Sequence, residues 1–526
     1  MATDPDAIHA AAPEKPSGEG RFGRKSTVRA ALMTTGSAYI SYLAGLITTA
    51  ALARTLGPGN YGIYAYFVWL TGMLSAIYNS GFGNTSIRFI SENLGRGLPD
   101  QCRAVMAWLR RRYWVGLGVA TIGFVSVGPW LKPDGDSSIS VTFLVMVVVA
   151  AAAKSGFTML ASFGKGYGRF EIESFTTSAL ALVNIVGVVA LVLDGAGLQA
   201  FAGLFVLLCI AHLVLAQLLS VRAGIASSPA LLDPEIRSRL AVNLRWSILF
   251  ALLAAFGASS IEIYLLNRAE GSAAVAYFSL ALSFSRAGVN LFIVGISSTV
   301  LPILAHAYGK DAAVGAARLA RRAMRYAHLL GMSIAGLGFF LAFPAVRVLY
   351  GEQYLTSVWI LQCIIVAKAF TVSGGVLTAL FVANDQQRGR TTILALTLIV
   401  NVSVAAALVP NFGLLGAVIS SVLSGIFDLT ILLVVATREF GLRLPMDSVV
   451  RLTACGLAAG IPAYVLARTG GGVAYHITAA GIFCAAYFPL AYAFGGWDSD
   501  DLSIMHAAAG RIPVLSSVVR RFGRVP

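Results

Sequence analysis

Long hydrophobic runs alternate with short polar segments along almost the whole chain. The clearest pair begins with an apolar run from Ala31 to Ala53, which is followed by a turn at 54–60 and a second apolar run from Tyr61 to Ser86. Each run is about as long as the roughly 20 apolar residues that cross a bilayer as a helix. The turn is too short for anything except re-entry into the membrane. This stretch therefore predicts a membrane hairpin.

The same pattern predicts fourteen membrane-spanning helices. Their approximate limits are 31–53, 61–86, 113–131, 138–163, 174–194, 199–221, 244–267, 273–305, 325–350, 355–384, 391–409, 413–437, 448–468 and 472–495. The fifth and sixth spans are separated by only a few small residues after Asp194, and the eleventh and twelfth by only Pro410 and Asn411. Counts of twelve or thirteen spans therefore stay open.

Composition indicates an all-α integral membrane protein. Of the 526 residues, 57% are hydrophobic and 12% are charged, whereas a soluble protein carries about 25% charged residues. The net charge of +15 follows from the positive-inside rule, because 31 of the 39 lysines and arginines fall on one predicted side and only five on the other. We therefore expect both termini in the cytoplasm and no nucleic-acid partner.

A long polar segment divides the predicted spans into two sets of six, followed by two further helices. We expect two six-helix lobes around a central cavity, in the manner of transporters that are built from repeats. The predicted parts are a disordered cytoplasmic tail (1–30), an N-lobe (31–221), a cytoplasmic connector (222–243), a C-lobe (244–437), two C-terminal spans (438–495) and a cytoplasmic tail (496–526). The last tail is predicted either to lie on the inner membrane surface as an amphipathic helix or to be a frayed end.

Three basic residues fall near the middle of predicted spans: Lys154, Arg286 and Lys368. A charge at mid-span costs roughly 2.5–3.5 kcal/mol on insertion scales if it faces lipid. We therefore expect all three to face a water-filled cavity, where an excess of positive charge favours an anionic cargo.

Two acidic residues share the apolar spans, Glu262 near one end of its span and Asp428 in the middle. Each is predicted either to pair with a cation for structural reasons or to couple transport to protons or Na⁺. Arg88 ends the second span. It can extend to the membrane interface as arginines commonly do, or it can hold a lipid phosphate.

No pattern indicates an enzyme, a metal site or a cofactor. The chain has no phosphate-binding Gly-x-x-x-x-Gly-Lys loop and no His-Glu-x-x-His sequence, and its five cysteines have no metal-ligand spacing. Most of the cysteines lie in apolar segments, where small buried side chains are the expected interpretation.

The hairpin resembles the Wzx-type polysaccharide and O-antigen flippases of the multidrug/oligosaccharidyl-lipid/polysaccharide (MOP) superfamily. The resemblance rests on residues 53–64, which include Gly57-Pro58-Gly59, and on residues 81–88, which begin Gly81-Phe82-Gly83. Shorter matches follow at 301–305 and 411–417, so that the resemblance covers residues 30–440.

This resemblance implies two six-helix lobes that form a V around a central cavity, plus two C-terminal helices. It implies transport of undecaprenyl-diphosphate-linked oligosaccharide from the inner to the outer leaflet of the bacterial inner membrane. It further implies membrane lipids, a polysaccharide polymerase and a chain-length regulator as partners. The basic residue that follows the Gly-x-Gly sequence in that family is similar to Arg88.

Three other functions stay open. A peptidoglycan lipid-precursor flippase would share the fold and the anionic cargo. An ion-coupled drug exporter of the multidrug and toxin extrusion (MATE) type would favour acidic cavity residues for cationic drugs. A non-transporting scaffold of a glycan synthase complex would not depend on the mid-span cations.

Overall fold

The computed structural model describes residues 24–131, 133, 140–225, 231–258, 261–384 and 386–494. Side chains are described for most of these residues, apart from stretches such as 24–32, 290–299 and 305–313. All regular elements in the described residues are helices, in agreement with the all-α prediction. The expected C-terminal tail (496–526) lies outside the described residues, as does most of the expected N-terminal tail.

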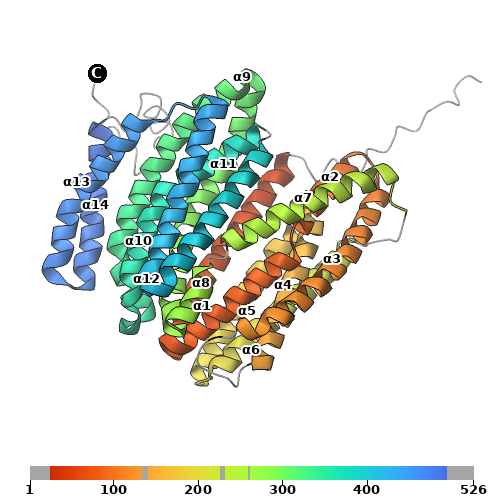
Figure 1. The fold of residues 1–526 in the computed structure, drawn as a ribbon, viewed down its shortest axis with the longest axis horizontal. Coiled ribbons are helices and arrows are strands. Elements are labelled where there is room, and N and C mark those ends of the chain that lie inside the picture. The colour runs from red at the N-terminus through yellow and green to blue at the C-terminus, as the bar shows by residue number, and fades with distance from the viewer. Residues whose placement is uncertain are drawn as a thin grey trace, which may run out of the picture. The chain divides into compact units, whose positions relative to one another are not determined.

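The helices vary widely in length, and several contain two of the predicted spans (Figure 1). They are α1 Arg24–Tyr78, α2 Phe82–Gly95, α3 Pro99–Val127, η1 Gly128–Trp130, α4 Ser140–Gly166, α5 Glu171–Leu193, α6 Leu198–Arg222, α7 Pro234–Ala258, α8 Glu262–Ala269, α9 Ser272–Tyr350, η3 Glu352–Tyr354, α10 Thr356–Thr371, α11 Ser373–Ala383, α12 Gln387–Phe440, α13 Met446–Gly470 and α14 Val473–Ala493.

Two expected turns are reduced to single glycines. In α1 only Gly57 leaves helical geometry (φ 70°, ψ 172°), where we expected a turn over 54–60. The following Pro58 disfavours helical geometry in the residue before it, and only glycine adopts this positive φ easily. In α12 the break falls at Gly413 (φ 51°, ψ −127°) and not at Pro410 and Asn411.

Other predicted boundaries were wrong. The second span was expected to run to residue 86, but α1 ends at Tyr78 and α2 begins at Phe82, after Gly81 with φ 73°. The charged segment 306–324 was expected to be a loop, yet it is part of the continuous helix α9. This segment is rich in alanine and arginine, which are strong helix formers, so polarity alone did not interrupt the helix.

Contacts between helices divide the chain into two compact units. Unit 1 comprises Met1–Thr55 and Tyr66–Ser259, and unit 2 comprises Leu56–Ala65 and Ser260–Pro526. In unit 1, α4 packs on α6 and α2, and α5 packs on α6. In unit 2, α9 packs on α10 and α11, and α13 and α14 pack on each other and on α9. The predicted lobe limits, 31–221 and 244–437, differ from this division at residues 56–65 and 244–259.

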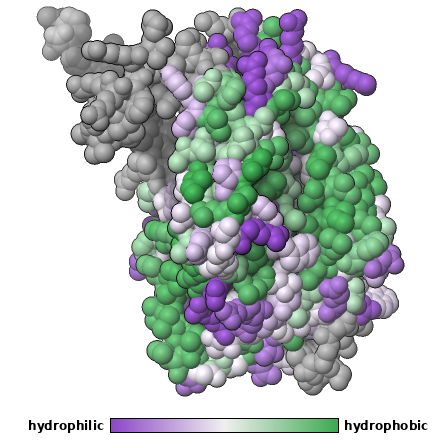
Figure 2. Space-filling view, turned by 90° about the vertical axis from the view of Figure 1, so that its left-hand side faces the viewer, coloured by the Kyte–Doolittle hydropathy of each residue, from purple (hydrophilic) through white to green (hydrophobic). Residues whose placement is uncertain are grey.

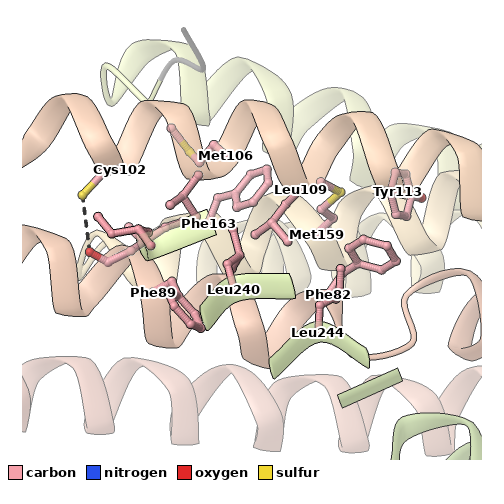
Figure 3. Close-up of a cluster of buried hydrophobic side chains, with 13 residues drawn as sticks. Phe82, Phe89, Cys102, Met106, Leu109, Tyr113, Met159, Phe163, Leu240 and Leu244 are labelled. Carbon is pink, nitrogen blue, oxygen red and sulfur yellow. Dashed lines mark hydrogen bonds between the residues drawn. The ribbon is translucent and has the colours of Figure 1, made fainter. Parts of the chain in front are cut away.

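A buried apolar cluster in unit 1 holds α7 against α2, α3 and α4 (Figure 3). Its buried members are Phe82, Phe89, Ile90, Cys102, Val105, Met106, Leu109, Tyr113, Met159, Phe163, Ile236, Leu240 and Leu244. Ile236 and Leu240 come from the expected connector 222–243, whose C-terminal part is the start of α7. Burial of their side chains provides the hydrophobic stabilisation that attaches α7 to unit 1.

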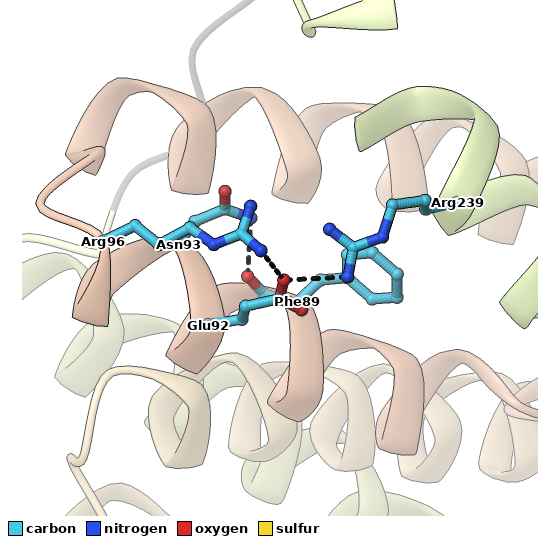
Figure 4. A network of polar contacts seen from close by, with 5 residues as sticks. All are labelled: Phe89, Glu92, Asn93, Arg96 and Arg239. Atoms are coloured by element: carbon cyan, nitrogen blue, oxygen red, sulfur yellow. Dashed lines mark hydrogen bonds and ion pairs between the residues drawn. The ribbon is translucent and has the colours of Figure 1, made fainter. Parts of the chain in front are cut away.

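Polar contacts next to this cluster also join α2 to α7 (Figure 4). Glu92 Oε1 accepts from Arg239 at 2.8 Å and from Arg96 at 2.6 Å. Thr85 Oγ1 donates to Asn243 Oδ1 at 3.2 Å. The start of α7 is therefore held to α2 by both apolar and polar contacts, which a loop connector would not provide.

Unit 2 includes a short part of α1, Leu56–Ala65, which packs through tyrosines. The Tyr61 ring contacts the Tyr354 ring edge-on, with 6.0 Å between ring centroids. Tyr354 also contacts the rings of Tyr277 and Tyr350. Burial raises the pKa of the Tyr354 phenol, so this side chain stays uncharged at neutral pH. Residues 56–65, expected to belong to the N-lobe, therefore pack within unit 2.

Large apolar side chains are exposed on many helices, as expected for surfaces that contact lipid. Figure 2 shows extensive hydrophobic areas on the visible face. Val186 is 69% exposed, Leu193 83% and Ile461 66%. Among the described residues, nine helical segments are long and apolar enough to cross a membrane, and some of them contain two predicted spans. The chain is thus a multi-pass membrane protein.

Candidate functional site

Glu262 is the most strongly buried of the predicted site residues, with 1% of its surface exposed. It stands in the first turn of α8, which begins at Glu262. A helix N-terminus favours a negative charge. Its Oε1 accepts hydrogen bonds from Asn401 Nδ2 at 2.8 Å, Ser420 Oγ at 3.1 Å and Ser421 Oγ at 3.2 Å. These donors, all on α12, stabilise a carboxylate in a buried position.

Arg286 on α9 and Lys368 on α10 lie close enough to interact electrostatically with each other and with Glu262. Arg286 is exposed and Lys368 half-buried. The two basic groups repel each other and both attract the Glu262 carboxylate, so two basic side chains stand beside one acidic side chain here. The structure thus brings together two of the three predicted mid-span cations and one of the two predicted acids, all within unit 2.

Asp428 on α12 belongs to a different contact. Its Oδ1 lies 3.4 Å from Arg390 Nη1 and accepts a hydrogen bond from Thr397 Oγ1 at 3.1 Å. Arg390, which we expected in a loop, stands in the first turn of α12, and the break at Gly413 separates it from Asp428. The nearby cation of Asp428 is therefore Arg390, and the role of this pair in ion coupling stays a prediction.

Lys154 on α4 is half-buried and lines a cavity inside unit 1. The cavity has a volume of about 240 Å³ and lies between α1, α4, α5 and α6. Lys154 is thus in a different unit from Arg286 and Lys368. Joint binding of one cargo by these three cations therefore stays a prediction.

Arg88 lies on α2 with its side chain exposed, and its guanidinium carbon is 5.7 Å from the centroid of the Phe89 ring. The Gly81-Phe82-Gly83 sequence before it has a packing role. A Cβ on Gly81 would overlap the backbone of Ser247 and Ile248 in α7, and one on Gly83 would lie 3.0 Å from Ser162 Oγ. These glycines therefore allow α2 to approach α4 and α7.

The residues that surround Glu262 were not predicted as site residues. Asn401 is a polar residue in a long apolar run, and Ser420 and Ser421 form a polar pair in another. Polar residues inside apolar runs could have indicated a site here. However, serines and asparagines in membrane helices commonly have structural roles. In the part of the chain that the structure describes, no group of three or more His, Cys, Asp or Glu side chains is placed to hold a metal ion.

The arrangement of helices is similar to that of solved MOP-superfamily transporters. A lipid II flippase, MurJ, in an inward-closed conformation aligns with a TM-score of 0.72 and 13% identity over 88% of this chain and 98% of that chain. A multidrug resistance MATE-family transporter in an inward-facing conformation aligns with a TM-score of 0.65 and 14% identity over 76% and 94%. A MOP-superfamily transporter from Pyrococcus furiosus, described as having a binding pocket of reverse polarity, aligns with a TM-score of 0.56 and 16% identity over 79% and 95%.

These likenesses define the class: the chain has the fold of the MOP-superfamily transporters, as its sequence predicted. A sequence profile of the polysaccharide biosynthesis protein family matches residues 27–307, more than half of the chain. The chain belongs to this family. Among curated protein sequences, none is significantly similar to the chain.

Proposed function

We propose that the protein moves an oligosaccharide linked to undecaprenyl diphosphate across the bacterial inner membrane by alternating access. Family membership and the transporter fold support transport in polysaccharide biosynthesis. The observation that carries the choice of cargo is the pair Arg286 and Lys368, which interact with each other and, among the described residues, with one carboxylate, that of Glu262. A lipid diphosphate supplies the negative charge that this pair attracts.

Binding of the diphosphate would use both cations at once. Charge-assisted hydrogen bonds from guanidinium and ammonium groups to phosphate oxygens are roughly twice as strong as neutral ones. The Glu262 carboxylate, held by Asn401 and the two serines of α12, would attract both cations when no cargo is bound. The glycan would occupy the hydrated side of the site, while the prenyl tail stays in lipid.

Release on the outer side would follow from rocking of the two lobes, as in other transporters built from repeats. With both termini in the cytoplasm, outward movement of each negative charge is favoured by about 2.3 kcal/mol per 100 mV of membrane potential. A cell interior that is negative therefore drives the diphosphate outward. Arg88 is proposed to meet the lipid phosphate as it enters the site.

A reconstitution experiment tests this function against the alternatives. Full-length protein in proteoliposomes should speed the movement of an undecaprenyl-diphosphate-linked oligosaccharide, followed through its exposure to an added, membrane-impermeant glycosidase. Lipid II and a cationic dye should move no faster than in protein-free liposomes. Movement of lipid II alone would make the protein a precursor flippase, and movement of the dye alone a drug exporter. If none of them moves, the scaffold interpretation is favoured.

Ion coupling at Glu262 is a separate proposal. A buried carboxylate with side-chain oxygens of Ser420 and Ser421 beside it can bind a proton or a small hard cation such as Na⁺. If it does, a Na⁺ or pH gradient should accelerate transport, and Glu262→Gln should reduce the rate to the value without a gradient. The matched control is Glu352→Gln, because Glu352 is an exposed acid that pairs with Arg347. Flux that is insensitive to both gradients in the native protein would contradict coupling.

A further inference from the structure

The cavity around Lys154 lies entirely within unit 1 and combines an apolar wall with a few polar groups. Its apolar side chains include Phe157, Phe205 and Leu208. Its polar side chains include Lys154, Thr177 and Asn184. Lys154 lies near His212 and acts on it electrostatically. The Nδ1 atom of His212 donates to the Leu208 carbonyl at 2.8 Å, because that oxygen can only accept.

Three polar side chains at this cavity lack partners among the described residues. Among the residues that the structure describes, Lys154 Nζ, Thr177 Oγ1 and the Asn184 side-chain amide have neither a hydrogen-bond partner nor an ion-pair partner. A lysine in a membrane helix normally faces water or an anion, because an uncompensated charge among apolar groups is unstable. The cavity therefore offers one cationic group and two hydrogen-bonding groups to an occupant.

The size of the cavity limits that occupant. A volume of about 240 Å³ is below the roughly 300–1,000 Å³ of sites for drug-sized ligands, and an apolar cavity of about 150 Å³ binds benzene. A fused pair of aromatic rings or a short alkyl chain is thus of suitable size, whereas a lipid-linked oligosaccharide is not. A sugar is disfavoured as well, since most of its hydroxyls would face apolar side chains without partners.

We propose that this cavity is a binding site for a small amphipathic monoanion, whose acidic group pairs with Lys154 and whose apolar body packs against Phe157 and Phe205. The Thr177 hydroxyl and the Asn184 amide donate to the remaining oxygens of the acid. This site does not depend on the cargo proposed above, and it assigns Lys154 a ligand other than the lipid diphosphate.

The experiment measures binding of 2-naphthoate to full-length protein in nanodiscs of neutral lipid by titration calorimetry, with empty nanodiscs subtracted. 2-Naphthoate should bind, and 2-naphthylmethylamine, which has the same rings and the opposite charge, should not. Lys154→Met should weaken binding at least about tenfold because the ion pair is lost. Lys154→Arg should retain binding, and so should Lys165→Met, which removes a lysine that lies outside this cavity and pairs with Glu173. Ala181→Leu, which fills the cavity without changing its charge, should abolish binding.

Two outcomes overturn the proposal. Equal binding of 2-naphthoate to the native protein and to Lys154→Met would show that the lysine does not hold an anion. Equal binding of the acid and the amine would show only partition into an apolar space. Sodium glucuronate, a competitor that is anionic but not apolar, tests whether the ligand needs an apolar body. If glucuronate displaces 2-naphthoate at equal concentration, the assignment is also contradicted. Size-exclusion elution of each variant reports whether it is folded, so that lost binding is interpreted only in folded protein.

Discussion

Replacement of both Arg286 and Lys368 by glutamine should abolish transport of the lipid-linked oligosaccharide while the protein remains in the membrane. Each cation is expected to contribute a charged hydrogen bond to the diphosphate, worth about 1.5–3 kcal/mol. A single replacement should therefore slow transport at subsaturating cargo by about tenfold or more, and the double replacement by at least about a hundredfold. The measurement is the rate of glycan exposure in proteoliposomes, together with the amount of protein in them.

The controls for this result keep charge or remove it elsewhere. Arg286→Lys and Lys368→Arg preserve the positive charge and should retain a large part of the activity. Arg347→Gln removes an arginine that pairs with the exposed Glu352 and should leave transport nearly unchanged. Native transport rates in the double variant would refute the assignment of the cargo site, whatever the other variants do.

Gly62→Ala should strongly reduce the yield of folded protein. A Cβ at this position would overlap the backbone carbonyl of Ser272, at the start of α9. Backbone cannot rotate away as a side chain can, so the close approach of α1 to α9 would be lost. Overpacking typically costs about 1–3 kcal/mol, and a clash with backbone should reach the upper end of that range or exceed it. The expected result is a lower apparent unfolding temperature in detergent.

The neighbouring Gly59→Ala is the matched control. A Cβ at Gly59 would have nothing within 4 Å, and the residue lies in the same helix, three positions earlier. Since glycine is a poor helix former, this replacement should leave stability unchanged or raise it slightly. Equal loss in both variants would mean that the close approach of Gly62 to Ser272 is not what holds this segment.

Much of the fold could be predicted from hydrophobic periodicity, because a bilayer requires long apolar helices whatever their packing. Boundaries were less predictable. The segment 306–324 is charged and was expected to be a loop, yet its helix-forming residues continue α9. The hairpin turn at 54–60 contains Gly57 and Pro58, but the chain needs only one non-helical glycine there. Polarity indicates where a chain leaves the membrane and does not by itself end a helix.

The candidate site was predicted in part. Arg286, Lys368 and Glu262 were found because ionisable residues are unusual in apolar spans, and unit 2 brings these three together. The donors to Glu262 could not be predicted, because Asn401 and Ser420 stand far from it in the sequence. Pairing of Asp428 with Arg390 likewise joins residues 38 positions apart, which lie on the two sides of the Gly413 break in α12.

The amino-acid sequence alone determined that this is an all-α membrane protein of the MOP type with cationic groups in its spans. Composition and hydrophobic length suffice for the membrane class, since they set the free energy of each segment in lipid, whereas the resemblance to the MOP superfamily rests on residues 53–64 and 81–88. Only the tertiary structure decided which charges meet: Arg286 and Lys368 with Glu262 in unit 2, and Lys154 at a separate cavity in unit 1. Contacts between side chains depend on how helices rotate and pack against each other, and periodicity along one helix does not specify its neighbours.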